Sequence, residues 1–232
     1  MRFAVLGTGM VGQTIAGKLE SLGHEVVMGT RDVAASMART DGDGRGTPPV
    51  SQWLTQHAGV GLAGFADAAQ SAETVVNTTA GMVSMSVLAA AGEANLAGKV
   101  LIDIANPLDF SAGMPPTLNP CNTESLGEQI QNAFPAALVV KTLNTMRTQV
   151  MVDPARVPGN HTVFLSGDDP AAKATVTEVL RSFGWSPANI LDLGPISTAR
   201  GAEMLLPVWL SVAAALGHFD FNIHIQVAEP TP

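Results

Sequence analysis

The stretch RFAVLGTGMVG, residues 2–12, decides the fold class of this 232-residue chain. It starts as a short apolar run and passes at once into a loop with the spacing G-x-G-x-x-G. A helical pattern follows, with apolar side chains at Ile15, Ala16 and Leu19, and a second apolar run occupies 26–28. The order strand, glycine loop, helix and strand predicts a dinucleotide-binding βαβ unit.

Each glycine of this loop has its own expected task. Gly7 makes the tight turn after the strand, Gly9 lets the backbone approach a pyrophosphate, and Gly12 lets the helix pack closely on the strand. Because a helix N-terminus attracts phosphate, we expect backbone N–H groups of the loop to face the cofactor, at Thr8, Met10 and Val11. The alternative is a plain strand-to-helix turn that uses glycine for its geometry alone.

The end of the second strand indicates which dinucleotide is bound. NAD-specific sites carry an Asp or Glu here that binds the ribose 2′-hydroxyl. Thr30 and Arg31 instead offer a hydroxyl and a guanidinium, which suit a 2′-phosphate. The predicted cofactor is therefore NADP rather than NAD. Asp32 is the nearest acid, and its alternative role is a helix N-cap. Arg45 is a further candidate for the 2′-phosphate, in a turn-rich loop that is otherwise typical of a solvated insertion.

Composition and charge exclude several classes of protein. Hydrophobic residues make up 46% of the chain and charged residues 14%, with a net charge of −8. This balance argues against nucleic-acid binding, which needs clustered Lys and Arg. The single cysteine, Cys121, excludes an internal disulfide framework and fits a reducing compartment. With a strand from residue 2 and no uninterrupted apolar run of membrane-spanning length, we expect a cytoplasmic protein without a membrane segment.

Strand and helix patterns alternate along most of the chain. Further strands are expected at 60–64, 74–79, 99–104, 138–141, 161–166 and 189–193. Helices are expected at 33–39, 50–58, 66–72, 83–91 and 170–183, and from 123 onward with Asn122 or Thr123 as cap. This alternation predicts an α/β fold, a Rossmann-type, doubly wound and mostly parallel sheet with extra strands.

The C-terminal stretch departs from the alternation. An apolar helix is expected over 197–217, kinked near Pro207, and a last strand over 219–225. We predict a main NADP-binding domain at 1–194 and a small C-terminal domain at 195–232. The second domain would form an acceptor pocket, a subunit contact or both.

Polar residues at strand ends mark the other half of the expected crevice. Ligands of open α/β sheets bind beyond the carboxyl ends of the strands. This rule predicts that the nicotinamide half of the cofactor is lined by Thr78, Thr79, Ala80, Asn106 and Pro107. Asn144, just past the strand at 138–141, is expected to bond the nicotinamide ribose or amide. For the two asparagines, a turn that ends a strand is the competing interpretation.

No catalytic residue and no metal site is predicted. The five histidines lack metal-ligand spacing, and the absence of tyrosine excludes a Tyr-x-x-x-Lys proton relay. Hydride transfer between two planar heterocycles needs stacking and exclusion of water more than an acid or a base. An apolar wall for this purpose is available at Met204 and Leu205, although these residues also fit the core of an interface helix.

Five motifs, spread over nearly the whole chain, resemble one family. They are GTGMVG at 7–12, LGHEV at 22–26 with GTR at 29–31, DIANP at 103–107, VKTLNT at 140–145 and TARGAEMLLP at 198–207. The chain resembles the NADPH-dependent coenzyme F420 reductases, and the last motif is the most specific. One departure is that Ala34 and Ala35 stand where family members carry a further basic residue.

The resemblance implies a dimeric enzyme that moves a hydride between NADP(H) and the deazaflavin F420. It implies that NADP is held by Thr8, Met10, Val11, Thr30 and Arg31, and that the deazaflavin lies against Met204 and Leu205. Two alternatives remain open. One is an NADPH-dependent reductase of another small redox acceptor, such as a flavin or a ferric chelate. The other is a non-enzymatic NADP(H)-binding sensor.

Overall fold

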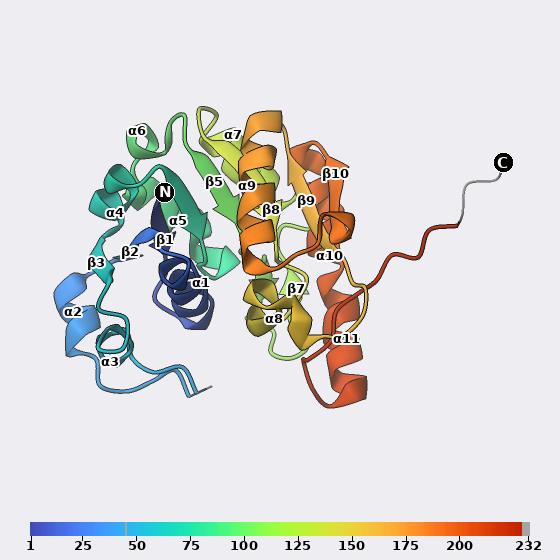
Figure 1. Cartoon of the computed structure of the whole chain (residues 1–232), viewed down its shortest axis with the longest axis horizontal. Helices are drawn as coiled ribbons and strands as arrows, with labels where there is room; N and C mark the ends of the chain where they lie inside the picture. The colour runs from blue at the N-terminus through green and yellow to red at the C-terminus, as the bar shows by residue number, and fades with distance from the viewer. Residues whose placement is uncertain (45, 229–232) are drawn as a thin grey trace.

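An eight-stranded sheet forms the centre of the computed structural model, which describes residues 1–44 and 46–228 (Figure 1). The strand order is β10-β9-β8-β5-β4-β1-β2-β3, and all neighbours are parallel except β8 and β9. The strands are β1 Arg2–Leu6, β2 Glu25–Thr30, β3 Val60–Gly64, β4 Thr74–Asn77, β5 Val100–Asp103, β8 Leu138–Thr142, β9 Val163–Gly167 and β10 Ile190–Gly194. This architecture confirms the predicted Rossmann-type fold with added strands.

Helices cover both faces of this sheet. They are α1 Met10–Ser21, α2 Val33–Ala38, α3 Val50–Leu54, α4 Phe65–Ser71, α5 Gly81–Ala91, α6 Glu93–Leu96, α7 Leu126–Ala133, α8 Thr148–Val152, α9 Pro170–Phe183, α10 Ala199–Met204 and α11 Leu206–Leu216. Successive residues of a strand face opposite sides, so Phe3 and Val5 pack with α1, α8 and α9, whereas Ala4 and Leu6 pack with α4, α5 and α7.

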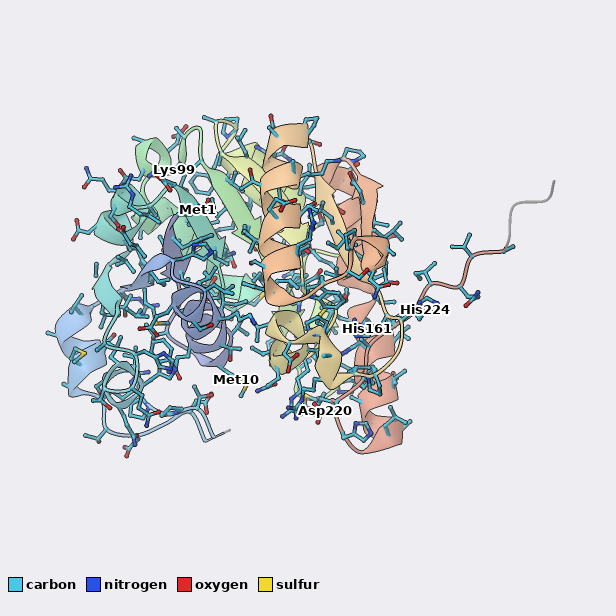
Figure 2. All side chains as sticks on the ribbon, viewed as in Figure 1. Met1, Met10, Lys99, His161, Asp220 and His224 are labelled. Carbon is cyan, nitrogen blue, oxygen red and sulfur yellow. The ribbon has the colours of Figure 1, made fainter. Side chains whose placement is uncertain are left out.

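The strand order reverses direction at β1, which lies between β2 and β4. The chain crosses from β3 to β4 at this point, so the loops after β1 and β4 diverge and leave a crevice. Figure 2 shows Met1 and Lys99, which precede β1 and β5, at one end of the molecule, and Met10 toward the other. The crevice therefore lies at the end of the sheet where α1 begins.

The prediction of a strand over 219–225 is wrong. These residues form no strand, and one backbone hydrogen bond, from Thr162 N–H to the Ile223 carbonyl (2.7 Å), joins them to the chain before β9. Side chains hold the segment instead. The rings of Phe219 and Phe221 lie 5.3 and 5.7 Å from that of Trp209, and Asp220 forms ion pairs. The alternating pattern arose from these side-chain contacts rather than from a ladder.

Local details also differ from expectation. Helix α7 is capped by Ser125, not by Asn122 or Thr123, because Ser125 and Glu128 form a reciprocal capping box. The loop at 108–120 contains a small antiparallel pair, β6 Leu108–Asp109 and β7 Thr117–Leu118, and α8 was not predicted. The expected break near Pro207 is confirmed, since α10 ends at Met204 and Pro207 lies in the first turn of α11.

One segment of the described chain, Ile196–Leu216, is long and apolar enough to cross a membrane by length and composition alone. Core helices of water-soluble proteins meet the same test. Arg200 and Glu203 interrupt the segment, and both charges are paired within the protein, with Glu128 and Lys141. The segment therefore agrees with the prediction that no uninterrupted apolar run has membrane-spanning length.

Candidate functional site

A groove of about 410 Å³ opens beyond the ends of β1, β2 and β4. Eight of the predicted cofactor residues line it, namely Gly7, Thr8, Gly9, Thr30, Arg31, Thr78, Thr79 and Ala80. Met10 instead lines a neighbouring cavity along α1. Seven further predicted residues are absent from the lining of this groove: Val11, Gly12, Asn106, Pro107, Asn144, Met204 and Leu205.

The three glycines of the loop differ in what a side chain would meet. A Cβ on Gly12 would lie 2.1 Å from the Gly7 carbonyl oxygen, and one on Gly7 would lie 2.9 Å from the Thr78 hydroxyl. Gly7 also has a φ of +119°, which only glycine adopts readily. A Cβ on Gly9 would meet nothing within 4 Å. Gly7 and Gly12 are thus required by the fold, whereas Gly9 keeps open the space that a pyrophosphate would fill.

The end of β2 carries hydroxyl and guanidinium groups that could bind an anion. The Thr30 and Ser36 hydroxyls lie 2.6 Å apart, and both residues line the groove together with Arg31. Asp32 accepts a hydrogen bond from the Ala35 N–H (2.9 Å) and caps α2, so its carboxylate is used by the helix, as its alternative role required. These groups fit a 2′-phosphate better than a 2′-hydroxyl.

Arg39, which the sequence analysis missed, lines the same groove from the C-terminal end of α2. It lies beyond the turn where Ala34 and Ala35 replace the basic residue of the family pattern. The signal that could have found it is its spacing, one helix length after Arg31. Arg45 lies outside the residues that the structure describes.

A buried ion triad lies on the other side of the crevice. The Lys141 ammonium contacts the Asp103 and Glu203 carboxylates, both at 2.8 Å, and the Lys141 side chain is fully buried. Glu203 also accepts the backbone N–H groups of Leu126 and Gly127 (2.8 and 3.1 Å), at the positive end of α7. The triad thereby fixes α10 against the centre of the sheet.

Protonation of this triad follows from its geometry. Burial by itself lowers the pKa of Lys141, but the carboxylates of Asp103 and Glu203 more than offset this, and the pKa lies above its usual value. The Lys141 ammonium is therefore held in its charged form by the two carboxylates.

Hydrogen bonds continue from the triad to the groove. Asn77 donates to Asp103 (2.8 Å), and its amide oxygen accepts from the hydroxyl of Thr79 (2.7 Å), which lines the groove. Ser84 closes this network by bonding both Asn77 and Thr79. A polar chain thus connects α10 with the rim of the cofactor groove.

The two predicted asparagines bind each other. The Asn106 amide donates to the Asn144 carbonyl (2.9 Å), and the Asn144 amide donates to the Asn106 side chain (3.1 Å) and to the Ala202 carbonyl (3.2 Å). Asn144 is buried and joins the end of β8 to α10. The contact of either side chain with nicotinamide stays a prediction.

Comparison with known proteins agrees with this arrangement. Residues 2–107 match the family described as NADP oxidoreductase, coenzyme F420-dependent. A solved structure of a candidate F420-dependent NADP reductase from Arthrobacter sp. FB24 is 60% identical, with a TM-score of 0.92 over 98% of this chain and all of that one. The chain belongs to the coenzyme F420-dependent NADP oxidoreductase family. It is accordingly an NADP-dependent oxidoreductase, and the non-enzymatic sensor is set aside.

More distant relatives of the chain share less. Metalloreductase STEAP3 of Rattus norvegicus is 30% identical over 99% of this chain, and the chain spans 43% of that protein's length. A reductive aminase from Aspergillus terreus, solved with NADPH4, cyclohexanone and allyl amine, is 16% identical with a TM-score of 0.62, over 92% of this chain and 62% of that one. The likeness to the aminase shows the fold alone.

Proposed function

We propose that this protein transfers a hydride between NADP(H) and a deazaflavin of the F420 type. The observation that carries the proposal is the anchoring of α10. Glu203 of that helix is buried in the ion triad, while the next residue, Met204, is 40% exposed. A rigid helix that presents an apolar side chain suits a planar heterocycle, because hydride transfer needs fixed orientation and exclusion of water.

In this proposal the residues of the chain bind and orient. When bound, NADP(H) supplies a hydride donor or acceptor at its nicotinamide ring. The glycine loop admits the pyrophosphate over Gly9, and Thr30 and Arg31 hold the 2′-phosphate. Thr78, Thr79 and Ala80 border the nicotinamide half, with Asn106 and Asn144 behind them. Met204 and Leu205, in the 195–232 segment, lie against the deazaflavin ring and exclude water from it.

A difference spectrum tests the proposal directly. Purified protein that has been shown to bind NADPH is mixed with F420, and the absorbance of both compounds is followed in both directions. We expect loss of the oxidised deazaflavin absorbance in step with loss of NADPH. No change in either direction, with NADPH bound, contradicts the proposal.

A reductase of another acceptor is the second candidate, favoured by the 30% identity to a metalloreductase. A flavin and a ferric chelate, offered with NADPH under the same conditions, distinguish it from the first. Turnover of either compound at a higher kcat/KM than F420 would favour the second candidate.

We also propose a cytoplasmic homodimer in which α11 forms the contact. Leu206 and Ala213 are the two buried residues of α11, whereas Val208 and Leu216 are 54% and 52% exposed. Such an apolar surface is typical of subunit contacts. Sedimentation should give twice the chain mass, and Val208→Asp should give single chains that still bind NADPH. A wild-type protein that sediments as one chain contradicts the dimer.

A further inference from the structure

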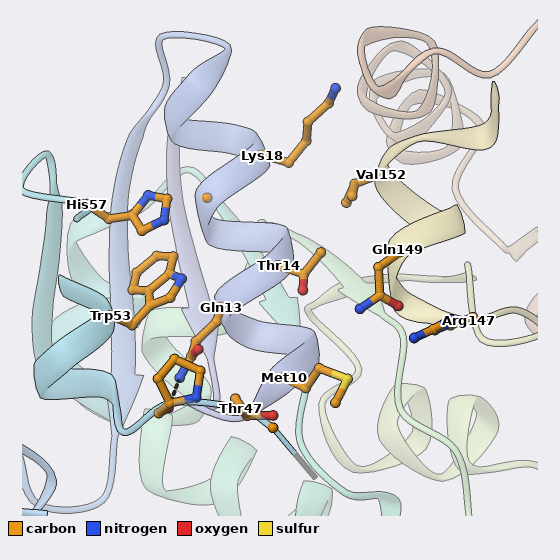
Figure 3. A pocket seen from close by; sticks show the side chains of 13 residues that line it. Met10, Gln13, Thr14, Lys18, Thr47, Trp53, His57, Arg147, Gln149 and Val152 are labelled. Atoms are coloured by element: carbon orange, nitrogen blue, oxygen red, sulfur yellow. Dashed lines mark hydrogen bonds between the residues drawn. The ribbon is translucent and has the colours of Figure 1, made fainter. Parts of the chain in front are cut away.

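A second cavity, of about 520 Å³, lies along α1 on the side that faces α8 (Figure 3). Met10, Thr14 and Lys18 line one wall at helical spacing of four, and Arg147 and Gln149 line the opposite wall. In Figure 3 the side chains of Arg147 and Gln149 point from α8 toward α1. A volume of this size is that of a small-molecule pocket.

Charge in this cavity is opposite to that of the whole protein. The chain has 20 acidic and 12 basic residues, yet among the described residues the lining contains Lys18, Arg147 and His57 and no carboxylate. His57 is paired with Glu20 (2.6 Å) and stacked on Trp53. The cavity is therefore a positive region on a negative protein, which attracts anions.

Arg147 shares its ion-pair partner with a second arginine. Its guanidinium contacts Asp220 at 2.9 Å, but the same carboxylate also accepts from Arg156 at 2.8 Å. Asp220 is thus shared by two guanidinium groups, and Asp153 adds a second negative charge on the side of Arg156. The two guanidinium groups hold the pKa of Asp220 at about 2, which keeps the carboxylate ionised at neutral pH.

Two buried polar atoms of the lining have no hydrogen-bond partner among the residues that the structure describes. They are the hydroxyl oxygen of Thr47, a residue that is 7% exposed, and the amide oxygen of Gln149. Buried polar groups are normally hydrogen-bonded. A ligand in this cavity would give both atoms the partner that they lack. The Gln149 oxygen needs a donor, such as a hydroxyl or an N–H group. The loop that carries Thr47 is held in place by Gln13, which donates to the Pro48 carbonyl (Figure 3) and also to the Thr8 carbonyl.

The cavity adjoins the proposed reaction site at both walls. Met10 begins α1 directly after the glycine loop. Arg147 follows Asn144 by three residues, a reach of at most about 11 Å along the chain, and Asn144 is bonded to the Ala202 carbonyl of α10 (3.2 Å). A ligand whose ring lies beside α10 could therefore extend an arm into this cavity.

We propose that this cavity binds the anionic side arm of the hydride-exchanging substrate, an arm that carries phosphate or carboxylate groups together with hydroxyl or N–H donors. Lys18 and Arg147 bind the anion, and Gln149 and Thr47 bind the polar part of the arm. The inference rests on the proposed function, since it assumes that a ring-bearing redox substrate lies beside α10. It adds that the arm, as well as the ring, is recognised.

The test compares acceptors with and without the anion, by calorimetric titration in the presence of NADP+. F420 is compared with its deazaflavin–ribitol core, which lacks the anionic arm, and FMN with riboflavin. We expect the anionic member of at least one pair to bind about fivefold more tightly at low salt, the size of one solvent-accessible charge contact. Lys18→Gln should abolish this preference and leave the affinity for NADPH unchanged.

Arg2→Gln is the matched control, because it removes one positive charge from a residue that pairs with Glu73 and does not line the cavity. It should retain the preference for the anionic member. The proposal is overturned if neither pair shows the preference, or if Lys18→Gln retains it. It is also overturned if inorganic phosphate alone binds as tightly as the anionic acceptors, which would identify a site for free anions. Failure of hydride transfer to F420 in the difference spectrum is a separate result, because these titrations measure binding without turnover.

Discussion

The groove beside β1 and β2 draws its residues from two short stretches, 7–12 and 29–39, together with the loop after β4. The opposite side of the crevice is held by Asp103, Lys141 and Glu203, which are 38 and 62 residues apart along the chain. The first region offers backbone N–H groups, small residues and the exposed cations Arg31 and Arg39. The second uses fully desolvated charges that only the folded sheet brings together.

This difference predicts on which side of the crevice a substitution leaves the fold stable. A local loop keeps its shape through its own glycines, so a side chain added there acts mainly on the ligand or on one turn. A buried ion triad is stable only when complete, because a charge left without its partner keeps the full cost of desolvation. We call the side held by the ion triad the acceptor half and the groove beside β1 and β2 the cofactor half. Substitutions in the acceptor half should therefore lower the stability of the fold, whereas substitutions in the cofactor half should lower the affinity for the cofactor.

The largest effect is expected from the triad. Lys141→Met leaves two buried carboxylates without their cation and should lower the free energy of unfolding by about 3–5 kcal/mol. Urea denaturation measures it. Arg2→Gln, which removes the exposed pair with Glu73, should cost about 0–1 kcal/mol. If both variants are equally stable, the triad does not anchor the acceptor half.

Within the six residues of the glycine loop, one glycine is expected to matter for cofactor binding and another for stability. Gly9→Ala should leave thermal stability near that of the wild type, because its Cβ meets no protein atom within 4 Å and its φ of −80° suits alanine. It should lower kcat/KM for NADPH roughly a hundredfold, the cost of a displacement of about 1 Å. Gly12→Ala is the contrasting variant, and it should lower the thermal stability itself. Unchanged NADPH kinetics in Gly9→Ala would contradict the pyrophosphate position.

The 2′-phosphate contact should show as a change of specificity. Arg31→Ala should weaken NADPH binding about 10- to 100-fold, the size of a charge-assisted hydrogen bond, and leave NADH within about twofold. Dissociation constants from fluorescence titration measure both. Arg39→Ala, at the far end of α2, should give a smaller loss in the same direction. Equal losses for both cofactors in Arg31→Ala would remove the assignment of NADP to this site.

The smallest effect is expected at Asp220, outside both halves. Its pKa is lowered from 3.8 to about 2 in the folded protein, chiefly by the hydrogen bond from Arg156, with Arg147 adding to it. A lowered pKa stabilises the fold above pH 3.8, and this contribution is lost as the pH falls through about 2. As the pH is lowered from 5 to 2, the thermal unfolding temperature Tm should fall less steeply in Asp220→Asn than in the wild type. Asp67→Asn, at an exposed position of α4, should follow the wild type.

Sequence alone predicted the part of the molecule whose information is local. The spacing Gly7, Gly9, Gly12 and the residues Thr30 and Arg31 act within one βαβ unit, so chain order and period were enough to predict the fold class, and the family resemblance was confirmed. Side-chain caps were predicted less well. Ser125 was missed as the cap of α7 because its partner Glu128 selects it over two neighbours with equal propensity.

Only the tertiary structure decided the acceptor half. Asp103 and Lys141 are paired in register on adjacent strands β5 and β8, and Glu203 reaches them from a helix after two further strands. No periodic pattern encodes such a meeting, because strand order and register depend on the whole sheet. Lys141 therefore resembled an ordinary strand residue, and the cationic cavity between α1 and α8 had no sequence signal. Local chemistry determined the groove that we assign to NADP, and long-range packing determined the side of the crevice that faces it.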